Sequence, residues 1–297
     1  MGRLIFVLGM GRSGTSAITR VLSLCGAALP DRLLPPNYGN PTGYWEPQDG
    51  LNLNEAFLQR HGSNWYDPRL HRFDEIVDSP DGQEFVDKIA ATLGERLCDP
   101  VSIIKEPRIT ALTPFWFAAA ERLEFSVGVV IAVRHPAEVA GSLAARDGVP
   151  IELSNTLWLK YNLLAEQRSR DLPRVFVEYP NLLSDWKREV DRVRRALAVD
   201  LSPKREEDVD KFLSPDLRRQ RVPVDNRNSV SPLAVVRAYS MLSKAGRDAA
   251  FSISEFESLV AGQMESSEAR AAVEQFSQGY QPKSVPQSAL VAEDIMS

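Results

Sequence analysis

The chain has 297 residues, of which 43% are hydrophobic and 25% charged, and its formal net charge is −5. This composition is ordinary for a soluble globular protein with a sizeable core. A mildly acidic chain lacks the basic face that neutralises the phosphates of duplex nucleic acid, so we expect no nucleic-acid partner. A small anionic ligand is compatible with this charge, because a few local arginines can hold one.

Apolar runs and cysteines favour a cytoplasmic protein. The first apolar run, residues 4–8, is too short for the core of a signal peptide, and no stretch approaches the roughly 18 apolar residues of a membrane span. The two cysteines, Cys25 and Cys98, are too few for a disulfide framework and lack metal-ligand spacing, so we expect both to be buried. The sequence leaves the oligomeric state open.

The first predicted elements are a strand and a helix joined by a glycine turn. Residues 4–8 are typical of a buried parallel strand, and residues 16–25 carry apolar side chains at helical spacing before Gly26. Residues 27–72 break the pattern with many Pro, Asn and Gly residues among aromatic ones. We interpret this stretch as an inserted lid that lines a substrate site, with a helix at about 51–61.

Strands and helices alternate beyond the lid. Apolar runs predict strands at 101–104, 127–133 and 175–177. Helical spacing predicts helices at 82–97, 113–122 with Pro114 in its first turn, 135–145, 151–171, 181–198, 232–244 and 254–276. Such alternation predicts an α/β fold with three layers, in which helices flank both faces of a parallel sheet.

We expect one domain over residues 1–277. It comprises the lid at about 27–72 and a helical C-terminal part at about 200–277. Residues 278–297 are poor in large apolar side chains, and we expect them to form a flexible tail.

A glycine loop rich in hydrogen-bond donors lies between the first predicted strand and helix. Gly9 and Gly14 have the G-x-x-x-x-G spacing of nucleotide phosphate loops. Backbone N–H groups at the start of the helix, together with the helix dipole, form an anion site there. The loop adds side-chain donors from Arg12, Ser13, Thr15 and Ser16. These features predict a phosphate-binding turn.

The loop departs from the pattern of nucleoside triphosphatases. Thr15 stands where those proteins carry Lys, and the strand predicted at 127–133 is followed by Arg134 where an Asp would hold Mg²⁺. A metal-bound triphosphate is therefore poorly supported. A P-loop kinase of a small molecule remains the alternative interpretation.

Three segments resemble the sulfotransferase family, particularly its bacterial branch that acts on carbohydrates and lipids. Residues 11–16 resemble the 5′-phosphosulfate loop, with Arg12 where many members carry Lys. Residues 130–136 followed by Ser142 resemble the 3′-phosphate loop. Residues 177–183 resemble the Tyr-Glu-x-Leu segment, although Pro180 replaces the acidic residue. The segments occur in the family's order, each on the expected element.

The resemblance covers roughly residues 4–197 and implies a P-loop NTPase-like fold and an enzyme. Its reaction would move a sulfonate from 3′-phosphoadenosine 5′-phosphosulfate (PAPS) to a hydroxyl of a carbohydrate, lipid or other small molecule, leaving adenosine 3′,5′-bisphosphate, without a metal. The loop from Gly11 to Ser16, including Gly14, would hold the phosphosulfate. Arg134 and Ser142 would hold the 3′-phosphate, and we expect Tyr179 to contact the adenine.

Two separate anion sites are what such a donor requires. Arg134 follows a predicted strand, and ligands of doubly wound sheets bind at the carboxyl ends of strands. Ser142 lies eight residues further on, where the next helix can direct its hydroxyl towards the same phosphate.

Sulfonate transfer needs in-line positioning, charge stabilisation and a base for the acceptor hydroxyl. Arg12 is the candidate that stabilises the leaving phosphate, and its role is electrostatic because arginine does not give up its proton. Residues 105–108 resemble the Lys-acid-Pro segment of carbohydrate-directed sulfotransferases. We expect Lys105 to contact the sulfonate and Arg108 to pair with Glu46 or with the ligand.

Glu46 is the preferred base. It lies among aromatic residues in the lid, which would desolvate it as a base acting near neutral pH requires. Related bacterial enzymes look similar here. His61, also in the lid, is the rival base, whereas His71 is expected to be exposed and His135 to begin a helix. No two histidines have ligand spacing, so we predict no metal site.

Other candidates are less specific. Arg218, Arg219 and Arg221 cluster where the family has a loop that contacts the nucleotide, but they do not match its Arg-Lys-Gly motif and also fit a solvated surface. Trp45, Phe57 and Trp65 either line an acceptor pocket or form the small core of the lid. A nucleotide-binding protein that has lost catalysis is a further alternative.

Overall fold

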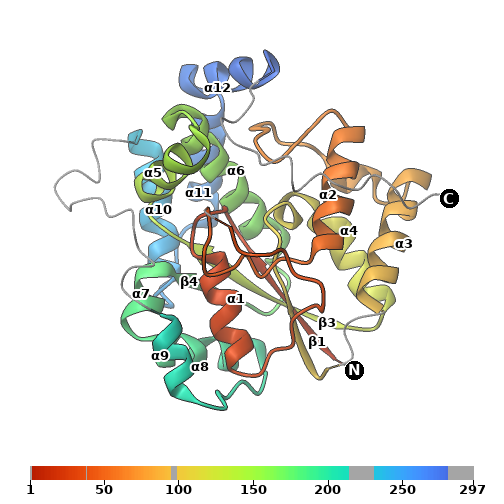
Figure 1. The fold of residues 1–297 in the computed structure, drawn as a ribbon. Helices are drawn as coiled ribbons and strands as arrows, with labels where there is room; N and C mark the ends of the chain where they lie inside the picture. The colour runs from red at the N-terminus through yellow and green to blue at the C-terminus, as the bar shows by residue number, and fades with distance from the viewer. Residues whose placement is uncertain (1, 38, 95–98, 214–230, 280–297) are drawn as a thin grey trace.

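Four parallel strands form the central sheet (Figure 1), in the order β2-β1-β3-β4. They are β1 (Arg3–Leu8), β2 (Val101–Ile104), β3 (Ser126–Val133) and β4 (Arg174–Glu178). The computed structural model describes residues 2–37, 39–94, 99–213 and 231–279. The chain leaves β1 towards β2 on one side and later adds β3 and β4 on the other side. The winding therefore reverses between β1 and β3, the position at which such sheets bind ligands.

Helices surround the sheet. They are α1 (Thr15–Leu24), α2 (Gln48–Arg60), η1 (Phe73–Ile76), α3 (Pro80–Gly94), α4 (Ile109–Arg122), α5 (Pro136–Asp147), α6 (Ile151–Arg168), α7 (Tyr179–Ser184), α8 (Trp186–Leu197), α9 (Glu206–Phe212), α10 (Leu233–Ala245), α11 (Ile253–Met264) and α12 (Ser267–Ser277). None of the described helices is both long and apolar enough to cross a membrane.

Each strand buries both of its faces. In β1, Leu4, Phe6 and Leu8 enter one core, whereas Ile5 and Val7 enter a second core on the opposite face. Alternating side chains of a strand point to opposite faces, so a strand covered on both sides must be apolar throughout. This confirms the predicted parallel sheet with helices on both faces.

The two cores differ in the helices that close them (Figure 1). Helices α1, α7, α8 and α9 cover the face of Ile5 and Val7. Helices α2–α6 and the C-terminal α10–α12 contribute to the core on the other face. The helical C-terminal part therefore packs into the same core as the lid helix α2.

The helix predicted to begin at Thr113 begins at Ile109, so the predicted start was wrong and Pro114 lies inside α4. Proline has no N–H, which would leave the carbonyl of Thr110 without its usual helical donor. The Thr113 hydroxyl lies 3.5 Å from that carbonyl and donates to it. The helix continues through the proline, and the Thr113 hydroxyl partly replaces the missing donor.

Two helices predicted as continuous are interrupted. The helix predicted at 181–198 is divided at Asp185, whose carboxylate accepts a hydrogen bond from the Arg188 N–H and caps α8. The helix predicted at 254–276 is divided at Ser266, whose hydroxyl accepts a hydrogen bond from the Ala269 N–H and caps α12. Asp and Ser are strong N-cap residues, and here their capping bonds override the apolar spacing that runs through both breaks.

Candidate functional site

The glycine loop between β1 and α1 adopts backbone angles that favour glycine. Gly9 has φ +113° and Gly14 φ +89°, and Arg12 between them also has positive φ, +68°. A Cβ on Gly14 would lie 2.3 Å from Cδ2 of Tyr179. A Cβ on Gly11 would lie 2.7 Å from the Trp65 ring. The glycines thus allow two aromatic rings to pack directly against the loop backbone.

Replacing Gly14 by Ala is expected to destabilise the protein by about 2–5 kcal/mol, because the left-handed backbone and the collision with Tyr179 add together. Urea unfolding measures this loss. Gly62→Ala is the matched control: Gly62 also has positive φ, but a Cβ added there would have no atom within 4 Å. The control should lose only about 1–2 kcal/mol. Equal losses would show that Tyr179 does not pack on the loop.

The start of α1 is open to an anion. Its N-cap, Gly14, has no side chain to accept a hydrogen bond, and the first turn contains no acidic residue. Nearby, the fully buried Ser13 Oγ has no hydrogen-bond partner among the described residues. The first N–H groups of a helix lack internal acceptors and carry a partial positive charge. A bound anion at this position supplies the acceptor that both groups lack.

The Arg12 side chain joins the loop to α5 and to the lid. Its Nε donates to the Ser142 Oγ at 3.0 Å, and its Nη2 donates to the Gly39 carbonyl at 3.3 Å. Burial, and then the neighbouring charges of Arg146 and Arg134, lower the pKa of Arg12 to about 10. Arg12 therefore stays charged at neutral pH, with two further arginines in its surroundings.

Arg146 belongs to these surroundings, although the sequence motifs did not identify it as a site residue. It lies four residues after Ser142 on α5, which is the spacing of one helix face. Its guanidinium pairs with Asp147 at 2.6 Å. Its spacing from Ser142 could have indicated that both residues share a helix face. The predicted helix ended at 145, however, one residue before Arg146.

Arg134 follows β3, as predicted, and is held from several sides. Its Nε donates to Glu138 at 2.9 Å, and its Nη1 donates to the Arg12 carbonyl at 3.0 Å. The guanidinium lies 4.9 Å from the centre of the Tyr179 ring. The fold thus brings Arg12, Arg134, Ser142 and Tyr179 into one cluster where β1 and β3 end.

A buried ion pair lies beside this cluster. Lys105 Nζ, at the end of β2, donates to Glu46 Oε1 at 2.6 Å and to Ser16 Oγ at 3.0 Å. Lys105 is 1% exposed and Glu46 6% exposed. Burial lowers the pKa of Lys105, and the Glu46 carboxylate opposes this shift. Ser16 Oγ also accepts from Asn40 in the lid, at 3.3 Å. Lid, strand end and first helix therefore meet at Ser16.

Arg108 does not pair with Glu46, which was one of the two partners expected for it. Its guanidinium pairs with Glu55 of α2 and with Glu106. The expected pairing was wrong: Arg108 takes Glu55 and Glu106 as its partners, and Glu46 is paired with Lys105 instead.

The rival base His61 lies away from the ion pair. His61 ends α2, whereas Glu46 precedes its start, so the helix of 13 residues, about 20 Å long, separates them. His61 Nε2 lies 2.8 Å from the Asp81 carboxylate. His135 caps α5 by accepting from the Ala137 N–H at 3.2 Å, as expected for a helix start.

One expectation for the lid was wrong. His71 is not exposed, because its Nε2 lies 2.6 Å from the buried Asp67 carboxylate. Of the alternatives left open for Phe57, the structure favours packing: its ring stacks on Phe85 with centroids 4.1 Å apart and lies in the core. Phe57 and Leu58 lie on the buried face of α2, opposite the exposed Asn52, Ala56 and Gln59.

Four of the candidate residues lie outside the part of the chain that the structure describes. They are Arg218, Arg219, Arg221 and Cys98, whereas Cys25 is buried as expected. Within residues 2–37, 39–94, 99–213 and 231–279, no three His, Cys, Asp or Glu side chains are grouped as a metal site would require.

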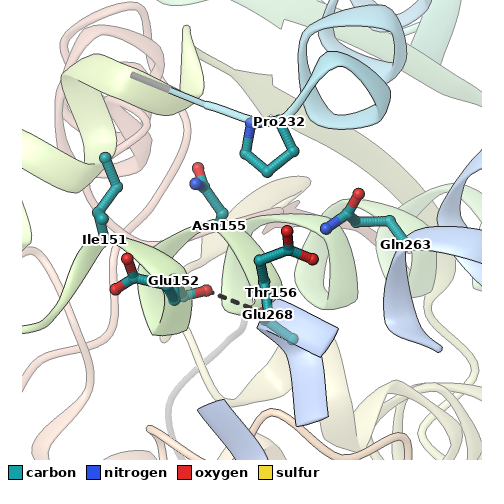
Figure 2. Close-up of a pocket in the computed structure, with 7 residues that line it drawn as sticks. All are labelled: Ile151, Glu152, Asn155, Thr156, Pro232, Gln263 and Glu268. Atoms are coloured by element: carbon teal, nitrogen blue, oxygen red, sulfur yellow. Dashed lines mark hydrogen bonds between the residues drawn. The ribbon is translucent and has the colours of Figure 1, made fainter. Parts of the chain in front are cut away.

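A small pocket of about 100 Å³ lies between the start of α6 and the C-terminal helices (Figure 2). Asn155 and Thr156 of α6 line it together with Gln263 and Glu268. Figure 2 shows the Thr156 hydroxyl donating to the Glu152 carbonyl, at 2.9 Å, as part of the first helical turn. None of these side chains belongs to the cluster at Arg12.

No protein-family model and no curated protein sequence matches the chain. Two solved bacterial structures are similar to it. The sulfotransferase domain of the Synechococcus PCC 7002 olefin synthase is 17% identical, with a TM-score of 0.43 over 89% of this chain and 95% of that one. Sulfotransferase STF1 from Mycobacterium tuberculosis H37Rv is 15% identical, with a TM-score of 0.41 over 77% of this chain and 76% of that one. Both of these proteins are sulfotransferases.

Proposed function

We propose that the chain is a sulfotransferase that moves a sulfonate from PAPS to a hydroxyl of a small-molecule acceptor. One observation carries the proposal: two places suited to anions adjoin at the ends of β1 and β3, beside the buried pair of Glu46 and Lys105. A carbohydrate, a lipid such as a glycolipid, or another hydroxyl-bearing metabolite fits this chemistry.

The two anion positions account for the two phosphate groups of the donor. The open start of α1, with the Ser13 hydroxyl, suits the 5′-phosphosulfate. Arg134 and Ser142 suit the 3′-phosphate, and Arg12 lies between the two positions because it donates to Ser142. An arginine in this place can serve both anions through its several donors.

Glu46 is suited to accept the proton of the acceptor hydroxyl. Its Oε1 is held by Lys105, whereas Oε2 receives no hydrogen bond from the described residues. As the acceptor oxygen bonds to sulfur, its proton passes to Glu46 and the bond from sulfur to the phosphate oxygen breaks. Negative charge then develops on adenosine 3′,5′-bisphosphate, and Arg12 and Lys105 stabilise it.

A small-molecule kinase fits these residues less well. Thr15 occupies the place of the phosphate-binding lysine, and Arg134 follows β3 where a carboxylate would hold Mg²⁺. Lys105, which bonds to Ser16 of the loop, is already paired with Glu46.

Thermal unfolding with nucleotides tests the donor. Adenosine 3′,5′-bisphosphate is expected to raise the unfolding temperature more than ATP with Mg²⁺ does, because a ligand that binds only the folded state stabilises it. Arg134→Ala should weaken binding of the bisphosphate about 10- to 100-fold more than binding of AMP, which lacks the 3′-phosphate. Stronger stabilisation by ATP with Mg²⁺ would favour the kinase instead.

Transfer of [³⁵S]sulfonate from PAPS to a panel of carbohydrate, lipid and small-molecule hydroxyls tests the reaction itself. We expect labelled product with at least one acceptor class. Binding of the bisphosphate without transfer to any acceptor would instead favour a protein that binds the nucleotide and lacks catalysis.

A further inference from the structure

A second group of polar bonds connects the lid to the loop after β2. Glu106 is fully buried, and its Oε2 accepts from Asn54 Nδ2 at 2.6 Å and from the Arg108 N–H at 3.1 Å. The Arg108 guanidinium pairs with Glu106 Oε1 and with Glu55. Asn54 Oδ1 accepts from the indole of Trp116 at 2.9 Å. Helix α2 is thus attached to the β2–α4 loop and to α4.

This group spans the same two chain segments as the ion pair at the site. Glu46 and Pro47 lead directly into α2, which carries Asn54 two turns further on. Lys105 directly precedes Glu106. A shift of α2 along the β2–α4 loop would therefore displace the Glu46 carboxylate from Lys105.

Glu106 is not itself suited to be the base. Both of its oxygens accept hydrogen bonds from protein donors, and the residue is 0% exposed. No oxygen of Glu106 is available to an acceptor hydroxyl, whereas Oε2 of Glu46 is not occupied by a described residue.

We propose that Glu106 and Asn54 are positioning residues, which hold α2 on the β2–α4 loop and so determine where the Glu46 carboxylate meets Lys105 and the acceptor hydroxyl. This inference rests on the proposed function. Because misplacement by about 1 Å can lower a rate about 100-fold, such residues act on kcat without touching the substrate.

The charge of Glu106 gives the inference a pH signature. Burial raises the pKa of Glu106 to about 7, and Arg108 opposes the shift. The carboxyl is charged above this pH and protonated below it, where its ion pair with Arg108 is lost. The charged and titratable groups around it are Arg108 on the same loop, Lys105 before it, Glu46 and Glu55 from the lid segment, and Tyr161 from α6.

Glu106→Gln is the direct test. We expect kcat for sulfonate transfer to fall about 100-fold above pH 7, with little change in the Kd of adenosine 3′,5′-bisphosphate. Below pH 7 the wild-type chain itself protonates Glu106, so its rate should approach that of the variant. The ratio of the two rates across pH 6 to 8 is the readout, because the wild-type chain loses the Glu106 charge over this range whereas the variant carries no charge there at any pH.

Glu166→Gln is the matched control. Glu166 is equally buried, and it pairs with Arg170 and Arg174 where β4 begins, at the edge of the sheet opposite the site. Its replacement should lower stability and leave both kcat per folded molecule and its pH profile unchanged.

Asn54→Ala provides a second variant should Glu106→Gln fold poorly. It removes one donor to Glu106 and the acceptor of the Trp116 indole without changing a charge. We expect a loss in kcat, again with nucleotide binding retained.

Suppose that the wild-type chain transfers sulfonate, but that Glu106→Gln and Asn54→Ala leave kcat per folded molecule and its pH profile unchanged, as Glu166→Gln should. This result would overturn the inference and leave the proposed function standing. Absence of transfer by the wild-type chain would overturn the proposed function and the inference with it.

Discussion

Glu46→Gln is expected to lower kcat for sulfonate transfer by about 100- to 10,000-fold, the usual contribution of a positioned base. Glutamine keeps the shape of the side chain and can still accept from Lys105 Nζ, but it cannot take the proton of the acceptor hydroxyl. Binding of adenosine 3′,5′-bisphosphate should be retained, because Glu46 lies on the lid side of the loop. Steady-state kinetics together with a binding titration measure the two effects separately.

His61→Gln is the control for this prediction. His61 was the other candidate base, and it lies at the far end of α2 with Asp81 as its partner. Its replacement should leave kcat close to the wild-type value. A large loss with His61→Gln and a small one with Glu46→Gln would reverse the assignment of the base.

Lys105→Met is expected to cost about 3–5 kcal/mol of stability, because it leaves the buried Glu46 carboxylate without its cation. This is a large share of the roughly 5–15 kcal/mol by which a folded protein is stable. Catalysis should also fall by about 100- to 1,000-fold, since one of the groups that stabilise the developing charge is removed. Urea unfolding and steady-state kinetics measure the two losses.

The double variant Lys105→Met with Glu46→Gln separates stability from catalysis. Removing both charges of a buried pair is far less costly than removing one, so the double variant should regain much of the stability that the single variant loses. It should not regain activity, because neither the base nor the cation is present. A double variant no more stable than Lys105→Met would show that the two side chains are not coupled as the structure indicates.

Only some of the features of the site were accessible from the sequence. The strand at 4–8, the glycine loop and the position of Arg134 after a strand depend on local patterns, and the structure has all of them. Parallel strands place their carboxyl ends at one edge, so the meeting of the two loops could also be expected. The predicted helix start at Thr113 and the predicted helix through Asp185 were wrong. At each place a single side chain makes a local hydrogen bond to the helix backbone that apolar spacing does not reveal.

The partners of the charged side chains were decided by the tertiary structure. Sequence reasoning named Glu46, Lys105 and Arg12 separately, but the bonds from Lys105 to Glu46 and from Arg12 to Ser142 join residues 59 and 130 positions apart. The lid has no regular periodicity from which such contacts can be inferred, so its side chains find their partners only when α2 packs on the β2–α4 loop. The sequence by itself determined the sheet, the phosphate loop and the residue types of the site. The packing of the lid decided which carboxylate each cation meets, because ion pairing depends on distances between segments that only the folded chain brings together.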